Sequence, residues 1–147
     1  MDFDIRQATA QDLERVLFLY REAGISAPAD LSVQDATAIL SKMSAYPNYK
    51  VFVAQIDGRI GGTFALLIMD NLAHGGMPSG IVEDVAVLPS LQGQGIGKKM
   101  MQYAMKRCRD HGCYKLVLSS NEMRTGAHKF YESLGFTRHG FSYKVDL

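Results

Sequence analysis

Residues 81–97 read IVEDVAVLPSLQGQGIG and join a short apolar run to a glycine-rich segment. The run at 81–88 is rich in β-branched residues, is too short for a buried helix and ends before Pro89, so it predicts a β-strand. Apolar residues then recur at intervals of three or four positions, some of them as adjacent pairs, which predicts an amphipathic helix that packs against this strand. These positions are Ile96, Met100, Met101, Ala104, Met105 and Cys108. A glycine-rich turn before a helix leaves backbone N–H groups open at the positive end of the helix dipole, which is typical of a phosphate-binding site.

Two well-known phosphate-binding loops do not fit the spacing of these glycines. A P-loop needs a glycine and a hydroxyl residue where this chain has Gln92 and Lys99. A dinucleotide fingerprint that starts at Gly93 would place Lys98 where its third glycine belongs. The remaining pattern is Gln-x-x-Gly-x-Gly after a strand that ends in Val-x-Pro. It resembles the acetyl-CoA pyrophosphate loop of the GNAT superfamily of N-acetyltransferases.

A second motif near the C-terminus supports the same resemblance. Residues 127–136, AHKFYESLGF, are similar to the family's C-terminal motif, a short helix that carries Phe-Tyr and is ended by Gly-Phe. Asn121 follows a predicted strand, as the family's cofactor-contacting asparagine often does. The resemblance covers nearly the whole chain and is sharpest over 81–136. It implies an α+β GNAT fold, with a mixed, mostly antiparallel sheet of six or seven strands, about four flanking helices and one domain over residues 1–147.

The other hydrophobic patterns predict the remaining elements. Strands are expected at 3–8, 50–56, 59–69, 115–120 and 137–145, helices at about 13–24, 32–46, 96–111 and around Tyr131, and loops at 26–30 and 70–80. Asp57-Gly58 suits the two φ > 0 positions of a type I′ hairpin turn. Thr9 and Asp12 suit an N-cap pair before the first helix.

Composition limits the classes of protein that fit. A chain of 147 residues with 47% hydrophobic and 21% charged residues suits one globular domain. A net charge of +1 gives no long-range field for nucleic acid or an anionic membrane. The start, Met-Asp-Phe-Asp, has acids where a signal peptide has bases, and no apolar run approaches the ~20 residues needed to cross a bilayer, so a cytoplasmic protein is expected. Two cysteines, Cys108 and Cys113, are too few for a closed metal centre, and no metal is expected.

In the family that the sequence resembles, an amine attacks the thioester carbonyl of acetyl-CoA directly. The resemblance implies that Tyr131 protonates the departing thiolate, since a phenol with a reference pKa of about 10 keeps its proton at pH 7. Adjacent carboxylates in an apolar strand are costly to bury, so at least one of Glu83 and Asp84 should line a wet cleft. Unbroken alternation puts the two on opposite faces of the sheet. The resemblance implies a general base on this part of the strand, with Glu83 preferred. A β-bulge would exchange the two faces, so Asp84 is the alternative general base. A further alternative is that both carboxylates form only salt bridges at the surface.

The resemblance also assigns residues to the cofactor. Backbone groups of Val85, Ala86 and Val87 would pair with the pantetheine arm, and one main-chain N–H there would face the thioester oxygen. The segment that would bind the diphosphate comprises Gln92, Gly93, Gln94, Gly95, Ile96, Gly97 and Lys98. Asn121 and Tyr131 would contact the cofactor as well.

The acetyl acceptor is the least determined part of the prediction. Tyr20, His74 and Tyr143 are weak candidates for contacts with it. Segments 81–87 and 112–115 look like glucosamine-phosphate N-acetyltransferases, whereas the tail from Asn121 to Tyr143 looks as much like aminoalkylphosphonate acetyltransferases. A small primary amine is the preferred acceptor, and a protein N-terminus or lysine is the alternative. A non-catalytic acyl-CoA sensor would be expected to lose Tyr131 or the acidic pair, and this chain keeps both. The resemblance further suggests a homodimer.

Overall fold

The computed structural model describes residues 1–25 and 31–147. The loop expected at 26–30 lies outside the described residues. The chain forms two compact units, Met1–Val117 and Leu118–Leu147, and each is described by itself. The expectation of one domain over the whole chain stays a prediction.

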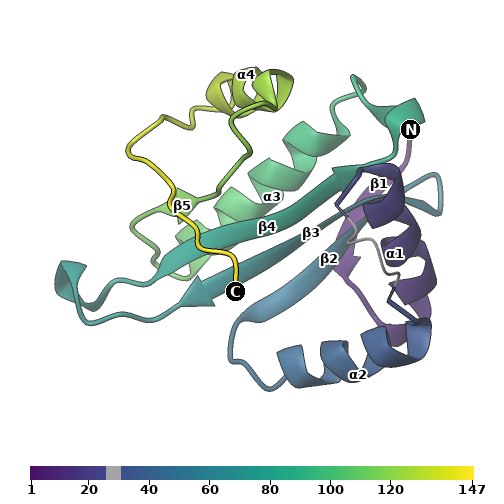
Figure 1. Cartoon of the computed structure of the whole chain (residues 1–147), viewed down its shortest axis with the longest axis horizontal. Helices are drawn as coiled ribbons and strands as arrows, with labels where there is room; N and C mark the ends of the chain where they lie inside the picture. Colours follow the sequence, from purple (N-terminus) through teal and green to yellow (C-terminus); the bar gives the residue numbers. More distant parts are fainter. Residues whose placement is uncertain (26–30) are drawn as a thin grey trace. The chain divides into compact units, whose positions relative to one another are not determined.

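The first unit is built on a five-stranded sheet with the order β1-β2-β3-β4-β5 (Figure 1). Its strands are β1 (Phe3–Gln7), β2 (Tyr49–Ile56), β3 (Arg59–Met69), β4 (Ser79–Val87) and β5 (Leu116–Val117). β1, β2, β3 and β4 pair antiparallel with one another in that order, and β5 pairs parallel with β4 through two residue pairs. The predicted mixed, mostly antiparallel sheet is therefore present, with fewer strands than the six or seven expected.

Two strand predictions were wrong. The strand expected at 115–120 shrinks to Leu116–Val117, and residues 137–145 form no strand. Alternation in a sequence shows that a segment tolerates an extended backbone, but a strand also needs a partner that supplies hydrogen bonds. No pairing with residues 137–145 occurs among the described residues.

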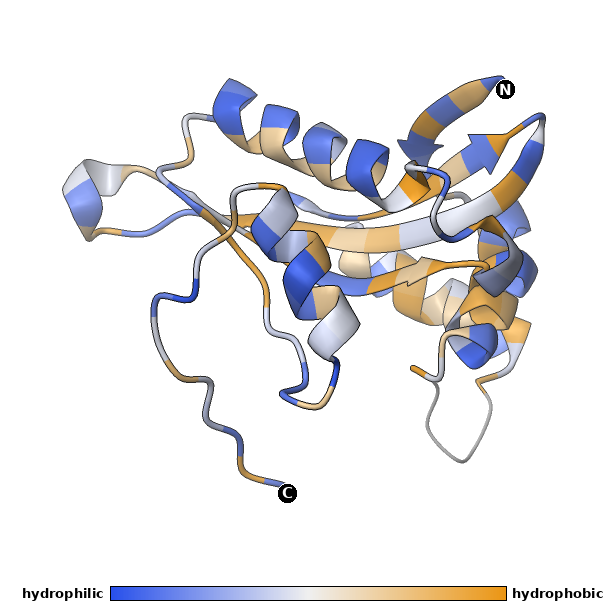
Figure 2. Cartoon of the chain, turned by 90° about the horizontal axis from the view of Figure 1, so that it is seen from above, coloured by the Kyte–Doolittle hydropathy of each residue, from blue (hydrophilic) through white to orange (hydrophobic). Residues whose placement is uncertain are grey.

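Helices cover both faces of the sheet. They are α1 (Leu13–Glu22) and α2 (Val33–Met43) on one side and α3 (Ile96–Asp110) on the other, with 3-10 turns η1 (Ala10–Asp12), η2 (His74–Gly76) and η3 (Pro89–Leu91) between elements. Figure 2 shows the hydrophilic positions of α3 turned away from the sheet. Val51 and Val53 of β2 pack with Val16 of α1. Phe52, between them, contacts Tyr103 of α3 at 5.3 Å between ring centroids. Alternate residues of β2 therefore face different helices, as the pleat of a strand requires.

The buried residues of α3 confirm the predicted stripe. They are Ile96, Met100, Met101, Ala104 and Cys108. Two local predictions near the N-terminal half are confirmed as well. Asp57 and Gly58 have φ values of 49° and 77°, as a type I′ turn requires. The Thr9 N–H donates to Asp12 Oδ2 at 2.7 Å, so this pair does cap the turn that leads into α1.

A β-bulge interrupts β4 opposite β3. Ala65 pairs with Glu83 and Thr63 pairs with Ala86, so one residue of β3 faces two of β4. Asp84 lies in this bulge with φ of 53°, a left-handed conformation that non-glycine residues seldom adopt. The assumption of unbroken alternation along β4 was therefore wrong at Glu83 and Asp84, and the alternative that allowed for a bulge is the observed one.

The second unit contains one helix, α4 (Thr125–Ser133), close to the short helix expected around Tyr131. Phe136 N–H donates to Tyr131 O at 3.1 Å and Gly135 N–H donates to Glu132 O at 3.0 Å, which is the Schellman pattern of hydrogen bonds. Gly135 has φ of 94°, so it supplies the left-handed residue that ends the helix. The Tyr131 and Phe136 rings lie 5.7 Å apart. The Gly-Phe pair thus ends the helix and packs against its tyrosine.

Candidate active site

The glycine-rich segment forms an open turn between η3 and α3. Gly93 and Gly95 have φ values of 78° and 81°, and a Cβ atom added to either would meet no atom within 4 Å. Glycine is therefore required at both positions by backbone conformation, and the space beside the loop is open. Two side-chain amides hold the turn: Gln92 Nε2 donates to Val87 O at 3.3 Å, and Gln94 Nε2 donates to Ser90 O at 3.2 Å.

Backbone N–H groups accumulate at this turn. In the described part of the chain no group accepts a hydrogen bond from the backbone N–H of residues 93–98, and the first donor satisfied within α3 is Lys99 N–H, bonded to Gly95 O at 3.1 Å. Unsatisfied donors at a helix N-terminus favour an anionic ligand. Lys98 is exposed beside them, whereas Lys99 Nζ lies 4.5 Å above the Phe3 ring and so is directed to β1.

One edge of β4 is left without a strand partner in the first unit. β5 pairs only with Gly80 and Ile81, so residues 82–87 have β3 as their single neighbouring strand among the described strands. Backbone groups at such an edge can pair with an extended ligand as if it were another strand. Val85, Ala86 and Val87 lie on this segment, which leads directly to the glycine-rich turn.

Two tyrosines lie on the α1 and α2 side of the sheet near the acidic pair. Tyr20 of α1 and Tyr49 of β2 pack against the same buried cluster, which comprises Ala8, Val16, Val51, Val53 and Ala65. Burial raises the pKa of Tyr20 and of Tyr49, and the charge of Asp84 raises both further. The charge of Glu83 also raises the pKa of Tyr49. We refer to Tyr20, Tyr49, Glu83 and Asp84 as the carboxylate–tyrosine cluster.

Both carboxylates of this cluster have shifted acidity. Burial raises the pKa of Glu83, and the neighbouring charge of Asp84 adds to the rise. Burial alone raises the pKa of Asp84. A carboxylate with a raised pKa that still ionises near neutral pH is a stronger proton acceptor, as a general base must be. The left-handed backbone of Asp84 is a second sign, because such strain persists mostly at functional sites.

The sequence analysis missed Tyr49, although a local signal was present. Tyr49 comes just after Pro47, where the second helix was expected to end, and it precedes Val51 and Val53 at alternating positions. The strand pattern therefore already placed it on the face of those valines. What the pattern lacked was the partner, because a local pattern does not show that the charges of Glu83 and Asp84 act on this tyrosine.

The other predicted site residues occupy separate places. His74, with φ of 53°, stacks on Tyr114 at 4.3 Å between ring centroids in the first unit. In the second unit, burial raises the pKa of Tyr131 and the charge of Arg124 lowers it. Asn121 Oδ1 accepts a hydrogen bond from Met123 N–H at 2.9 Å, so the side chain shapes the turn before α4. Tyr143 is 90% exposed.

Within residues 1–25 and 31–147 there is no group of three or more His, Cys, Asp or Glu side chains that could hold a metal ion. Across the same ranges, no helix is long and apolar enough to cross a membrane.

Comparison with known proteins places the chain in a family. A model of the acetyltransferase (GNAT) family matches residues 12–136. The chain is 41% identical over 98 residues to the glucosamine 6-phosphate N-acetyltransferase of Trypanosoma brucei brucei, which covers 67% of this chain and 65% of that protein. It is 27% identical over 144 residues to the aminoalkylphosphonate N-acetyltransferase of Salmonella typhimurium, which covers 98% and 91%.

Solved structures agree with this assignment. A putative acetyltransferase from Agrobacterium tumefaciens superposes with a TM-score of 0.91 at 31% identity and covers 98% of this chain and 99% of that chain. An acetyltransferase from Trypanosoma brucei superposes with a TM-score of 0.83 at 33% identity and covers 99% and 100%. The chain therefore belongs to the GNAT family of acetyltransferases, acyltransferases that take their acetyl group from acetyl-CoA, and its sheet and helices form the GNAT fold.

Proposed function

We propose that this protein transfers the acetyl group of acetyl-CoA to the primary amine of a small molecule by direct attack in a ternary complex. The acidic pair on the bulge of β4 carries the proposal, because the same strand leads into the turn with open backbone N–H groups. The two relatives named above support a small acceptor, since their names combine an amine with a phosphate or phosphonate. An aminosugar phosphate, an aminoalkylphosphonate or a similar amine is the proposed acceptor.

In the proposed reaction the backbone binds the donor. Residues 92–98 would hold the diphosphate of acetyl-CoA through the open N–H groups of residues 93–98, and Asn121 would contact the cofactor. The pantetheine arm would pair with the free edge of β4 at Val85, Ala86 and Val87, where a main-chain N–H would stabilise the oxyanion of the tetrahedral intermediate.

Proton transfer falls to the side chains. Glu83 or Asp84 would accept a proton from the substrate ammonium, directly or through water, and the neutral amine would then form its bond to the thioester carbon. The C–S bond breaks as the intermediate collapses, and Tyr131 would donate the proton that the leaving thiolate takes. The proton that the acetylated nitrogen then loses would restore the Tyr131 phenol. Burial raises the pKa of Tyr131, so its phenol holds that proton at neutral pH.

Acceptor contacts are assigned by the same reasoning. The hydroxyl of Tyr20 lies close enough to Asp84 to sense its charge, which supports a position for Tyr20 beside the substrate amine. His74, on the loop between β3 and β4, and Tyr143 stay predictions, as do a cytoplasmic location and a homodimer. Light scattering of the purified protein tests the dimer.

The acceptor class is tested by an acetylation panel read by mass spectrometry. The panel contains glucosamine 6-phosphate, an aminoalkylphosphonate, an aminoglycoside, and peptides with a free N-terminus or lysine. We expect acetyl-CoA-dependent product from a phosphorylated or phosphonylated small amine. Faster acetylation of peptides would favour the alternative acceptor, and acetyl-CoA binding without product from any amine would favour a non-catalytic sensor.

The general base is identified by the pH dependence of kcat/KM in Glu83→Gln and Asp84→Asn. The variant that lacks the base should lose at least ~100-fold in rate and also lose the acidic limb of the profile. Because the folded state raises both carboxyl pKa values, neither amide should lower Tm at pH 7, so lost activity would not reflect unfolding.

Tyr131→Phe should lower kcat, with the exposed Tyr46→Phe as its matched control. Equal kcat in Tyr131→Phe and wild type would remove Tyr131 as the acid.

A further inference from the structure

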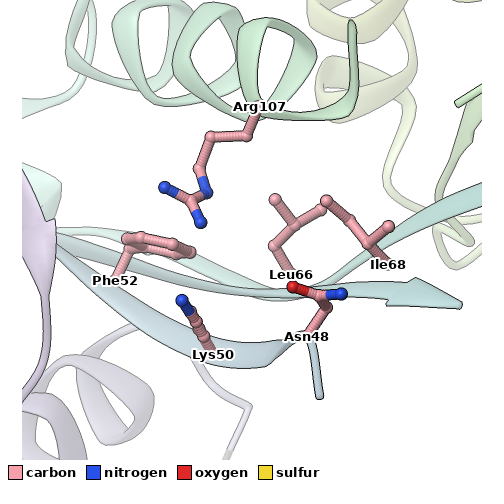
Figure 3. Close-up of a pocket in the computed structure, with 6 residues that line it drawn as sticks. All are labelled: Asn48, Lys50, Phe52, Leu66, Ile68 and Arg107. Carbon is pink, nitrogen blue, oxygen red and sulfur yellow. The ribbon is translucent and has the colours of Figure 1, made fainter. Parts of the chain in front are cut away.

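A small pocket opens between α3 and the two strands beneath it, on the face of the sheet away from the carboxylate–tyrosine cluster. It is partly open to solvent and is lined by Asn48, Lys50, Phe52, Leu66, Ile68 and Arg107. Figure 3 shows Arg107 reaching from α3, and Lys50 from β2, toward the same space. Backbone pairing holds the rim, since Ile68 N–H donates to Asn48 O at 2.9 Å.

The two cations of this pocket have no anionic partner among the described residues. Ion pairs in residues 1–25 and 31–147 involve other groups, and no described carboxylate lies within 4.0 Å of Lys50 or Arg107. Arg107 Nε is buried, and within the described structure it has no hydrogen-bond acceptor. A buried donor without an acceptor is unfavourable, and two cations that converge on one space repel each other. An anion with hydrogen-bond acceptors would satisfy both cations.

The surroundings of Arg107 favour a particular kind of anion. Its guanidinium lies over the Phe52 ring at 5.0 Å and near Tyr103 at 6.0 Å, which fixes the orientation of the plane. A fixed guanidinium presents paired N–H donors that match two oxygens of a carboxylate or phosphate. The apolar walls from Phe52, Leu66 and Ile68 reduce competition from water and strengthen the attraction.

We propose that this pocket is a binding site for a small oxyanion, a free phosphate or carboxylate or such a group on a small metabolite. Lys50 and Arg107 would neutralise its charge. The enclosed space is small, which excludes a larger ligand.

The site is separate from the candidate active site. Lys50 and Phe52 alternate along β2 with Tyr49 and Val51, so the pocket faces α3 whereas the carboxylate–tyrosine cluster faces α1 and α2. A bound oxyanion would join α3 to β2 and β3 and thereby stabilise the first unit. It would take no part in acetyl transfer, so the proposal holds whatever the acceptor is.

Titration of the ¹⁵N-labelled protein with inorganic phosphate, sulfate and acetate tests the proposal, at constant ionic strength maintained with chloride. The Arg107 Nε–H signal reports on the buried donor directly. We expect a saturable shift for at least one oxyanion, with a Kd in the millimolar range, and a rise in Tm of about 2–4 °C at saturating ligand. The three arms separate a preference for phosphate from one for carboxylate. A shift that grows linearly with concentration, or that chloride reproduces, would overturn the site.

Variants localise the response. Lys50→Met and Arg107→Met should each weaken binding at least ~10-fold, since each removes one of the two protein cations that would contact the ligand. Arg107→Lys keeps the charge and guards against an unfolded variant, and it should also bind more weakly because it loses the paired donors. Lys106→Met is the matched control. Lys106 is an exposed cation adjacent to Arg107 in α3 and is paired with Asp110 at 2.7 Å, so this variant should bind the oxyanion as the wild type does. Equal weakening in the control would refute the site. A second result would also refute the site: Arg107→Met changes the oligomeric mass but still binds phosphate. That result would mean that an acidic group of a second copy of the chain occupies the pocket.

Discussion

Asp12 and the pair Glu83 and Asp84 have carboxyl pKa values that shift in opposite directions. Asp12 accepts two hydrogen bonds from the Arg6 guanidinium, at 2.7 and 2.9 Å, and its pKa falls to about 2. Glu83 and Asp84 form no ion pair among the described residues, and desolvation of their carboxyl groups raises both pKa values. The first arrangement stabilises the ionised form and the fold. The second holds the ionised form at a cost to stability, as is common where a side chain serves catalysis.

The Asp12→Asn variant should lower the free energy of unfolding by about 1–2 kcal/mol at pH 7, after allowance for the partial exposure of Arg6 to solvent. The folded pKa of Asp12 is lower than its unfolded value of 3.8, so its contribution is complete above that value and disappears as the pH falls toward 2. Urea denaturation between pH 7 and pH 3 measures the difference between variant and wild type, which should shrink below pH 4. Asp110→Asn, in an exposed pair with Lys106, should change stability little. A difference that stays constant down to pH 3 would contradict the assigned pKa.

At the scale of the element, local chemistry sets both ends of α3. Gly95, in the left-handed region, is its N-cap residue, and the side-chain amides of Gln92 and Gln94 hold the preceding turn. At the other end Cys113 N–H donates to Cys108 O at 2.9 Å, and Gly112 has φ of 74°, so the helix closes with a Schellman motif. Both cysteines are free thiols. A helix with both ends determined locally presents its N-terminal N–H groups in a reproducible place.

Gly95→Ala and Gly58→Ala form a matched pair that separates backbone strain from cofactor binding. Both glycines have φ near 80°, and a Cβ atom at either meets nothing within 4 Å, so each substitution should lower stability by about 1 kcal/mol. Only the alanine at position 95 adds a methyl group beside the open N–H groups of the loop. Calorimetric titration with acetyl-CoA should therefore show binding about tenfold weaker in Gly95→Ala and unchanged in Gly58→Ala. Equal affinity in the two variants would move the diphosphate away from this turn.

At the scale of the whole molecule, burial is concentrated in the first unit. The fully buried side chains come from α1, β2, β3, β4 and α3, among them Leu19, Phe52, Phe64, Val82 and Met100. In the second unit every residue is half-buried or exposed, and α4 is stabilised by its own aromatic contacts and caps. Segments with little buried apolar surface open more readily than a packed sheet does.

Amide hydrogen exchange should follow this division. Exchange in β2, β3 and β4 should require near-global unfolding, whereas residues 118–147 should exchange faster by local opening. Saturation with acetyl-CoA should slow exchange at residues 82–98, where the donor is proposed to bind, and around Asn121 and Tyr131 if these contact the cofactor. Unchanged exchange around Tyr131 in the saturated protein would argue against its proposed role, while leaving the loop assignment intact.

Much of the candidate site could be predicted from local sequence. The strand before Pro89, the glycine-rich turn, the apolar stripe of α3 and the Gly-Phe end of α4 each follow from the conformations open to a few adjacent residues. The errors arose where distant residues decide the outcome. Residues 137–145 alternate as a strand does yet form no pairs, and the bulge at Asp84 depends on how β4 registers against β3.

The sequence by itself therefore indicated the family, through the resemblance of its two motifs. It also determined the element types over most of the chain and the loop proposed to bind the diphosphate, because turn chemistry and side-chain period act over a few residues. Only the tertiary structure decided that Glu83 and Asp84 act together on Tyr49, and that Lys50 and Arg107 meet in one pocket without an acid from the described residues. The physical reason is the same for both. A one-residue change in strand register, or the packing of a helix across a sheet, brings together charges that are far apart along the chain. A local sequence pattern does not show which of these residues lie close in space.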